Sequence, residues 1–275
     1  MRLARAARFG DTVTATDAYG TDTFLCQLAP LDLFRVEGVK IKVKQLTTAP
    51  DVVMPARGVI RIDTQVYIIS HGSPDFWKGD CIRRNYVTQA ADGLGTIISI
   101  ADALTGNTGT QAYAAAEFSR YLPEAGDSSK LPPQYEMFLA ETESVPADTL
   151  ISLNSKWYLV KESYQSASGV RVALANILDE PLFETVSFGS RTYDPITDTY
   201  SGSPATVKIM RVKWTEHYNY LSIGSETYER GDVQVFMPKT TAPKASDTLT
   251  LSDGTWRILA VQNETSRWSC HVRRA

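Results

Sequence analysis

The sequence predicts a mainly β fold, made of tandem small antiparallel β-barrel or sandwich modules with one short helical insertion. Short runs rich in Val, Ile, Thr, Tyr and Trp alternate with clusters of Gly, Pro, Asp and Ser, which is the pattern of strands and turns. In Ile151-Ser152-Leu153-Asn154 apolar and polar residues alternate, as in a strand with one solvent-exposed face. The third observation is an internal repeat.

A strand–turn–strand pattern occurs three times, at residues 58–69, 148–160 and 247–259. Each copy has an apolar strand, a tight polar turn and a second strand that opens on an aromatic residue. The third copy carries Asp253-Gly254, a strong hairpin signal because both residues tolerate positive φ. A proline precedes each copy and a further strand follows it: Pro55, Pro146 and Pro243, then Cys81–Val87, Val170–Ala175 and Cys270–Arg273.

The spacing of these copies, roughly 90 to 100 residues, is the size of one small β domain. It predicts three modules, residues 1–91, 92–183 and 184–275, with boundaries near Ala91 and Phe183. The alternative is chance, because hairpins of ordinary composition resemble one another. The shared proline, turn position and trailing strand favour duplication of one module.

The remaining elements are expected from local composition. Val207–Trp214 and Val233–Met237 are rich in apolar residues and predict strands. The alanine run within Gln111–Tyr121 predicts a helix in the middle module. Residues 99–110 are rich in Gly, Thr and Asn and predict a loop, to which Asp102–Leu104 adds a helical turn at most.

Composition and charge are those of an ordinary globular protein. Of 275 residues, 43% are hydrophobic and 21% charged, which argues against wholesale disorder. The net charge is −3. Proteins that grip DNA through its phosphates carry a strong basic excess. The charge therefore argues against a protein that grips DNA; that the chain surrounds DNA and lets it slide is a separate hypothesis, not an inference from charge alone.

No motif predicts an enzyme, a cofactor or a metal site. The GxSxG, GxxxxGK[ST] and GxGxxG patterns are absent. His71, His217 and His271 have no second ligand at a metal-binding spacing. Glu141 and Glu143 are adjacent acids that we interpret as solvated loop charge.

The cysteines and the N-terminus indicate a protein made and assembled in the cytoplasm. Cys26, Cys81 and Cys270 are odd in number and widely spaced, so they are expected to be reduced and buried. The first residues include early arginines but no apolar core, so they do not form a secretion signal. No run approaches the roughly 18 apolar residues of a membrane span, and no membrane partner is expected.

Two basic pairs, Arg83-Arg84 and Arg273-Arg274, stand at positions that the repeat makes equivalent in two modules. They are candidates for contact with an acidic neighbouring subunit or with DNA. The alternative is the solvated side of an edge strand, where charge discourages aggregation. Arg230-Gly231-Asp232 spells an adhesion tripeptide, for which a turn before the next strand is the preferred interpretation.

The chain from about Val186 to its end carries a recognisable order of turns and strands. Ser190–Pro204 predicts a hairpin, in which Tyr193-Asp194-Pro195 opens the turn. Val207–Trp214, Glu229–Phe236 and the hairpin at Asp253-Gly254 follow. This order resembles the head-closure (stopper) and head–tail joining proteins of long-tailed bacteriophages. The resemblance covers about a third of the chain.

The resemblance implies a non-enzymatic structural protein of the virion, located at the neck. In that family a small β-barrel forms a ring below the portal, helps to close the DNA-filled head and receives the tail. The implied partners are further copies in a ring of about six or twelve, a portal or adaptor protein, and a tail terminator or tail tube. DNA would pass without sequence-specific contact.

Two features depart from that family. Its members are usually single modules, whereas this chain carries three, and the helical insertion of the middle module has no counterpart in the third. The additional mass would build a wider collar, or let one chain do the work of two neck proteins.

An aromatic segment of the third module is a candidate interface. Trp214, Tyr218 and Tyr220 lie in a long connection between two strands, and in the family such connections face the channel or a neighbouring subunit. Aromatic residues there suit interface anchors. The alternative is that they cap the barrel.

Two further classes of function remain open on the sequence. One is another virion part: a tail terminator, a collar, a baseplate hub or a capsid decoration. The other is a carbohydrate-binding β module, in which Trp77, Trp157, Trp256 and Trp268 would stack on sugars. Trp157 and Trp256 lie at repeat-equivalent strand starts, which favours core packing over sugar binding.

Overall fold

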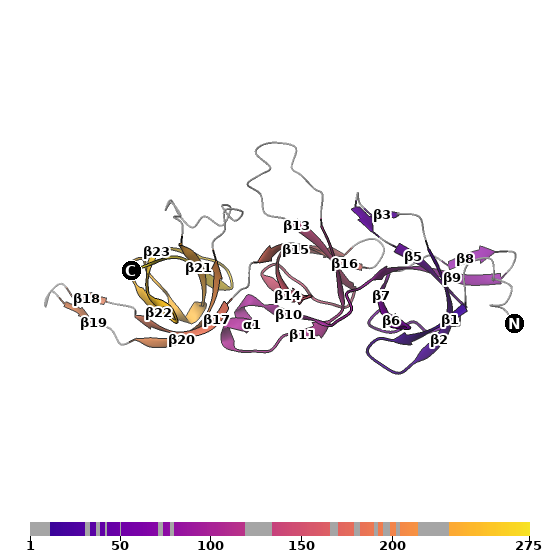
Figure 1. Cartoon of the computed structure of the whole chain (residues 1–275), viewed down its shortest axis with the longest axis horizontal. Helices are drawn as coiled ribbons and strands as arrows, with labels where there is room; N and C mark the ends of the chain where they lie inside the picture. Colours follow the sequence, from indigo (N-terminus) through magenta and orange to yellow (C-terminus); the bar gives the residue numbers. More distant parts are fainter. Residues whose placement is uncertain are drawn as a thin grey trace. The chain divides into compact units, whose positions relative to one another are not determined.

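The computed structural model confirms a mainly β protein with one short α-helix among the residues it describes (Figure 1). These residues are 12–30, 34–36, 39–41, 43–49, 51–70, 74–77, 80–118, 134–165, 170–178, 182–189, 192–194, 199–201, 204–213 and 231–275. The strands fall into three groups along the chain.

The first group is a closed barrel of six antiparallel strands. In chain order these are β1 (Thr12–Asp17), β2 (Thr23–Pro30), β5 (Val43–Thr48), β6 (Val59–Ile62), β7 (Gln65–Ser70) and β9 (Asp80–Gln89). Around the barrel they lie in the order β1-β2-β5-β9-β7-β6, and β6 pairs with β1 to close it. Strand β8 (Pro74–Trp77) pairs with the start of β9, and β3 (Phe34–Val36) and β4 (Val39–Ile41) form a separate hairpin.

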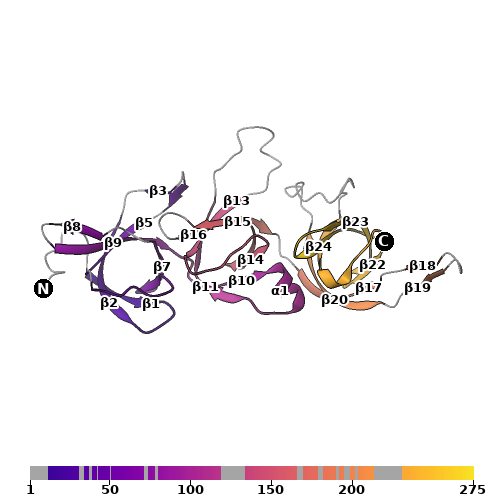
Figure 2. The same cartoon turned by 180° about the vertical axis from the view of Figure 1, so that it is seen from behind.

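The third group is also a closed six-stranded barrel (Figure 2). Its strands are β17 (Leu182–Gly189), β20 (Ala205–Lys213), β21 (Val233–Pro238), β22 (Thr248–Leu251), β23 (Gly254–Asn263) and β24 (Arg267–Arg274). They lie in the order β17-β20-β21-β24-β23-β22, and β22 pairs with β17. The predicted hairpin within Ser190–Pro204 is present as β18 (Thr192–Asp194) and β19 (Thr199–Ser201).

The middle group is a seven-stranded sheet whose two edge strands are consecutive in the chain. Its strands are β10 (Gly95–Ser99), β11 (Thr110–Ala112), β12 (Ala114–Phe118), β13 (Gln134–Ala140), β14 (Thr149–Leu153), β15 (Lys156–Gln165) and β16 (Val170–Leu178). They lie in the order β11-β10-β14-β15-β16-β13-β12. Only Tyr113 separates β11 from β12, so this pair acts as one strand that pairs with β10 at one end and β13 at the other.

All three groups therefore share one strand order. When β11 and β12 are counted as one strand, each group has six strands. Numbered along the chain, they lie side by side in the order first, second, third, sixth, fifth and fourth, and the fourth pairs with the first. Divided by contacts, the chain forms two compact units, residues 1–97, 111–121 and 134–176, and residues 98–110, 122–133 and 177–275. The first unit thus holds the first group and most of the middle group. The predicted boundaries near Ala91 and Phe183 stay a prediction.

The three repeated hairpins are the fourth and fifth strands of each barrel. Their turns use residues that accept positive φ: Asp63 (φ 53°) in the first, and Asn154 and Ser155 (φ 49° and 61°) in the middle. In the third, Leu251 pairs with Gly254, so the two turn residues are Ser252 and Asp253. The turn lies one residue earlier than the Asp253-Gly254 signal indicates.

The predicted helix over Gln111–Tyr121 is wrong. Its described part is strands β11 and β12, and the helix, α1, is Ile100–Thr105 in the segment expected to be a loop. Alanine favours helices only weakly, and β12 gains a full ladder to β13 together with burial of Ala114 and Ala115. The signals for α1 were its caps: the Ser99 hydroxyl accepts the Asp102 amide hydrogen, and Gly106 ends the helix at φ 90°.

Alternating residues of each strand build the barrel cores. In β21, Val233, Val235 and Met237 face the core of the third barrel, while Gln234 and Phe236 lie on the other face. The equivalent aromatic residues of the fifth strands, Tyr67, Tyr158 and Trp256, are 2%, 5% and 4% exposed. The predicted equivalence of Trp157 with Trp256 is wrong: by strand register Tyr158 matches Trp256, and Trp157 matches Thr255.

Cys26 and Cys270 are free, fully buried thiols, and we predict that they do not react in the folded protein. Burial raises the pKa of Cys26 to about 12 and also raises the pKa of Cys270, so neither forms the reactive thiolate at pH 8. Iodoacetamide followed by peptide mass analysis should find both unmodified in native protein and both modified in guanidinium chloride. Rapid native labelling of either would contradict the burial.

Candidate interaction sites

The predicted interface residues lie in different parts of the fold. Trp214, Tyr218 and Tyr220 lie outside the described residues. Arg83 and Arg84 lie in β9, and Arg273 and Arg274 lie in β24. As candidates for contact with a neighbouring subunit they remain predictions.

The two arginine pairs are not at equivalent positions, contrary to the repeat interpretation. Arg83 and Arg84 pair with Thr48 and Thr47 near the beginning of the sixth strand, whereas Arg273 and Arg274 form its end in the third barrel. The repeat correctly predicted that both pairs lie in a sixth strand. In the first barrel this strand begins earlier because its start pairs with β8, so Arg83 and Arg84 do not align with Arg273 and Arg274.

Arg273 is held by a buried carboxylate. Its Nε and Nη2 donate to Asp232 Oδ1 and Oδ2, each at 2.8 Å, which is the bidentate geometry that makes such pairs strong. His271 Nε2 lies 2.6 Å from the same Oδ2 atom. The Asp232 side chain is 2% exposed and that of His271 is fully buried. Arg273 is thus already used inside the third barrel, whereas Arg274 is exposed and donates to the Asp253 carbonyl.

Asp232, His271 and Arg273 therefore form an internal polar cluster rather than an adhesion motif. Asp232 belongs to the Arg-Gly-Asp tripeptide and, as expected, precedes the strand β21, but it is a structural anion. Sequence reasoning missed the cluster because its members come from β24 and the residue before β21. The only signal was the alternation of His271 and Arg273 on one face of a strand.

A second cluster lies within the first compact unit, where the first barrel meets the middle group. Val59, Val66 and Ile68 of the first barrel pack with Tyr113 and Phe138 of the middle group in one buried core. The strands thus use both faces: one fills its own barrel and the other fills this shared core. The two groups within this unit are joined by hydrophobic burial as well as by chain continuity.

Arg57 lies at the edge of the shared core and contacts Tyr19 and Glu143. Its guanidinium carbon lies 3.7 Å from the centre of the Tyr19 ring, and Nη2 lies 2.6 Å from Glu143 Oε1. The Tyr19 hydroxyl accepts the backbone N–H of Tyr113 at 3.0 Å, and Tyr19 has its pKa raised by burial. Glu143 is 7% exposed, so its interpretation as solvated loop charge is wrong.

The tryptophans proposed for sugar stacking differ in their exposure. Trp256 is 4% exposed and donates through Nε1 to Asp253 Oδ1 at 2.9 Å, so its ring belongs to the core. Trp157 and Trp268 are half-buried. The Trp77 side chain lies outside the described residues.

Among the described residues, no three His, Cys, Asp or Glu side chains converge in a way that would hold a metal ion. In the same part of the chain, no helix is both long and apolar enough to cross a membrane. Comparisons with known protein families, with curated proteins and with solved structures find no match. The resemblance to phage head-closure proteins therefore rests on the sequence of residues 186–275.

Replacing Asp232 by Asn is predicted to lower the free energy of unfolding by about 2 kcal/mol, because it removes the buried anion that accepts two hydrogen bonds from Arg273, a side chain 33% exposed, and that lies against His271. Urea denaturation followed by tryptophan fluorescence measures the change. The control is Asp253→Asn, since the Asp253 side chain is 42% exposed beside Arg211 and should lose less than about 1 kcal/mol. Equal losses would show that the cluster adds nothing beyond a surface ion pair.

Replacing Arg57 by Ala is predicted to cost about 1–2 kcal/mol and to increase amide hydrogen exchange in β12 and β13. The reason is loss of both the ring contact and the ion pair at the rim of the shared core. Arg257→Ala is the control, because that exposed side chain donates one hydrogen bond, to Ser246 Oγ. Unchanged exchange in β12 and β13 of Arg57→Ala would refute the role of Arg57 at this rim.

Proposed function

We propose that this chain is a structural protein of the phage neck, which forms a ring between the DNA-filled head and the tail and helps to close the head. The carrying observation is the third module: a six-stranded barrel with the hairpin β18–β19, built from the residues whose order resembles the head-closure family.

The unpaired strands of the described residues support assembly into a ring. Barrel closure satisfies the edges of the first and third barrels, which leaves unpaired edges on β8, on the hairpins β3–β4 and β18–β19, and on β11 and β12 of the middle sheet among the described residues. An isolated two-stranded hairpin is marginally stable in water, and an open edge is a template for pairing with another chain. In a cyclic assembly each copy would pair such an edge with its neighbour.

Charge supports a passive relation to DNA. The chain carries 28 Lys and Arg against 31 Asp and Glu. A channel protein with no basic excess would not hold the phosphates that pass through it. The ring would act as a conduit and seal, with the portal on one side and a tail terminator or tail tube on the other.

The proposal predicts rings with cyclic symmetry when the full chain is mixed with the portal ring encoded in the same genome. Native mass spectrometry gives the copy number, and negative-stain images give the symmetry. A variant in which Gly-Gly replaces residues 192–201 should lose ring formation, because it lacks the open hairpin. Leu94→Ala, at a side chain 48% exposed, is the control and should assemble normally.

Two results would contradict the proposal. One is a chain that stays monomeric both alone and with the portal. The other is binding elsewhere in the purified virion, such as the baseplate or the capsid surface, which would make the chain a different structural part. Unchanged ring formation in the hairpin variant would remove β18–β19 from the interface while leaving the ring.

A further inference from the structure

Two positions, one in the fifth and one in the sixth strand, are apolar in the third barrel and polar in the middle group. In the third barrel, Val261 is the eighth residue of β23 and Trp268 the second of β24, and both pack against its core. In the middle group the eighth residue of β15 is Ser163 and the second of β16 is Arg171. The register agrees for the sixth strand, because Trp268 pairs with Met237 and Arg171 with Leu139, each the penultimate residue of the third strand.

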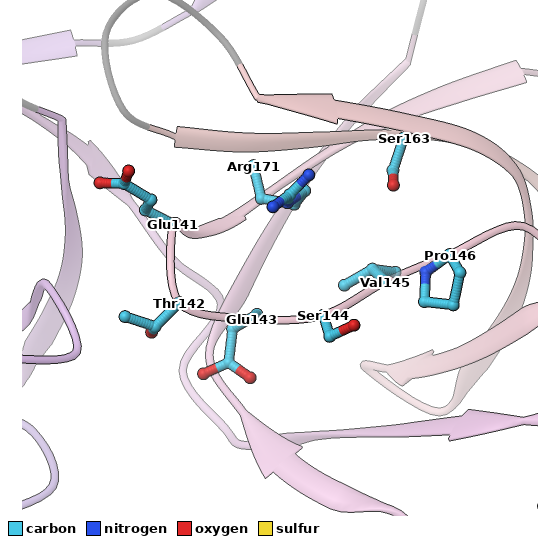
Figure 3. Close-up of a pocket in the computed structure, with 8 residues that line it drawn as sticks. All are labelled: Glu141, Thr142, Glu143, Ser144, Val145, Pro146, Ser163 and Arg171. Carbon is cyan, nitrogen blue, oxygen red and sulfur yellow. The ribbon is translucent and has the colours of Figure 1, made fainter.

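In the middle group the two polar residues line a pocket. The pocket has a volume of about 300 Å³ and is lined by Glu141–Pro146, Ser163 and Arg171 (Figure 3). In the third barrel the corresponding Trp268 donates through Nε1 to the Lys239 carbonyl and lies beneath the Lys239 ammonium. Trp268 thus packs against its own barrel and Lys239, whereas Arg171 lines a pocket.

Arg171 brings a positive charge into this pocket without a partner among the described residues. Its Nε is buried and makes no hydrogen bond there. Figure 3 shows the two nearby carboxylates directed away from the guanidinium. Both are engaged elsewhere: Glu143 pairs with Arg57 at 2.6 Å, and Glu141 accepts a hydrogen bond from Gln165. A buried donor left without an acceptor carries a desolvation cost that an anionic ligand would offset.

The surroundings of Arg171 select the kind of anion. Ser163 directs its hydroxyl toward the 141–146 segment and adds a donor, while Val145 and Pro146 are the apolar residues of the lining (Figure 3). Glu141 and Glu143 also line the pocket, so their negative charge disfavours a dianion such as phosphate. A guanidinium fork matches the planar geometry of a carboxylate.

We propose that the pocket between the 141–146 segment and Arg171 binds one carboxylate group, with Arg171 as its main ligand. The group belongs to a polypeptide, as an Asp or Glu side chain, or to a small organic acid. The inference does not depend on the neck function, because it follows from the middle group alone.

The test is a titration of the full chain labelled with ¹⁵N-arginine, in which the Nε–H signals are followed at constant ionic strength. One signal, assigned to Arg171 by its absence in Arg171→Gln, should shift saturably with sodium acetate and more strongly with glutarate. Arg171→Gln should weaken glutarate binding at least tenfold by isothermal calorimetry. The matched control Arg257→Gln removes an exposed arginine of β23 and should leave the affinity unchanged.

Two further experiments distinguish a polypeptide carboxylate from a small organic acid and exclude misfolding as the cause of weaker binding. Binding of the blocked peptide acetyl-Gly-Glu-Gly-amide as tightly as glutarate indicates a polypeptide ligand, and exclusion of the peptide indicates a small acid. Ser163→Val, which places the third barrel's valine in the pocket wall, should also weaken glutarate binding while the melting temperature is kept. Non-saturable shifts, phosphate binding tighter than acetate, or unchanged affinity in Arg171→Gln would each overturn the proposal.

Discussion

Pairing of the third with the sixth strand is the interaction on which the rest of this structure depends. It joins β5 to β9, β13 to β16, and β21 to β24, each across a stretch of chain that contains the whole central hairpin. Without this pairing the first and third barrels would be open sheets with two exposed edges, and their inward-facing residues would have no enclosed core. Of the two other recurrent pairings, the one within the hairpin is local, whereas the pairing of the first with the fourth strand spans an even longer stretch of chain; neither closes a barrel alone.

The shared frame leaves the outer faces and the barrel ends free to differ. The outer face of β6 and β7 is apolar and joins the shared core of the first unit, and β24 places His271 and Arg273 around Asp232. At one barrel end, Trp268 packs onto the core in the third barrel while Arg171 leaves a polar hollow in the middle group. Differences at such positions give the three groups different surfaces on one strand order.

The sequence was informative where structure is local. The period of two, the turn residues and the repeated hairpin predicted the strand content and the three hairpins, because these depend on neighbours in the chain. The alanine run misled, since the pairing of β12 with β13 outweighs a weak helix propensity. Of helix α1 only a turn at Asp102–Leu104 was predicted, because six residues carry little periodicity, although Ser99 and Gly106 marked both ends.

The candidate sites could be predicted only in part. Sequence reasoning selected Arg273 but not its partner Asp232, because the pair forms only after β21 and β24 meet. No local sequence pattern indicated the roles of Arg57, Glu143 and Arg171, because these roles depend on residues that are distant in the chain. Their roles follow from strand register, which one sequence specifies only weakly.

The most direct test of the repeated barrel is the cross-strand nuclear Overhauser effect between third and sixth strands in deuterated protein. Three contacts are predicted, between the paired backbones of Lys44 and Val87, Tyr135 and Ala175, and Val233 and Val272. Observation of all three would establish one strand order used three times. Absence of the Tyr135–Ala175 contact, with the other two present, would contradict the account by removing the middle group from the repeat.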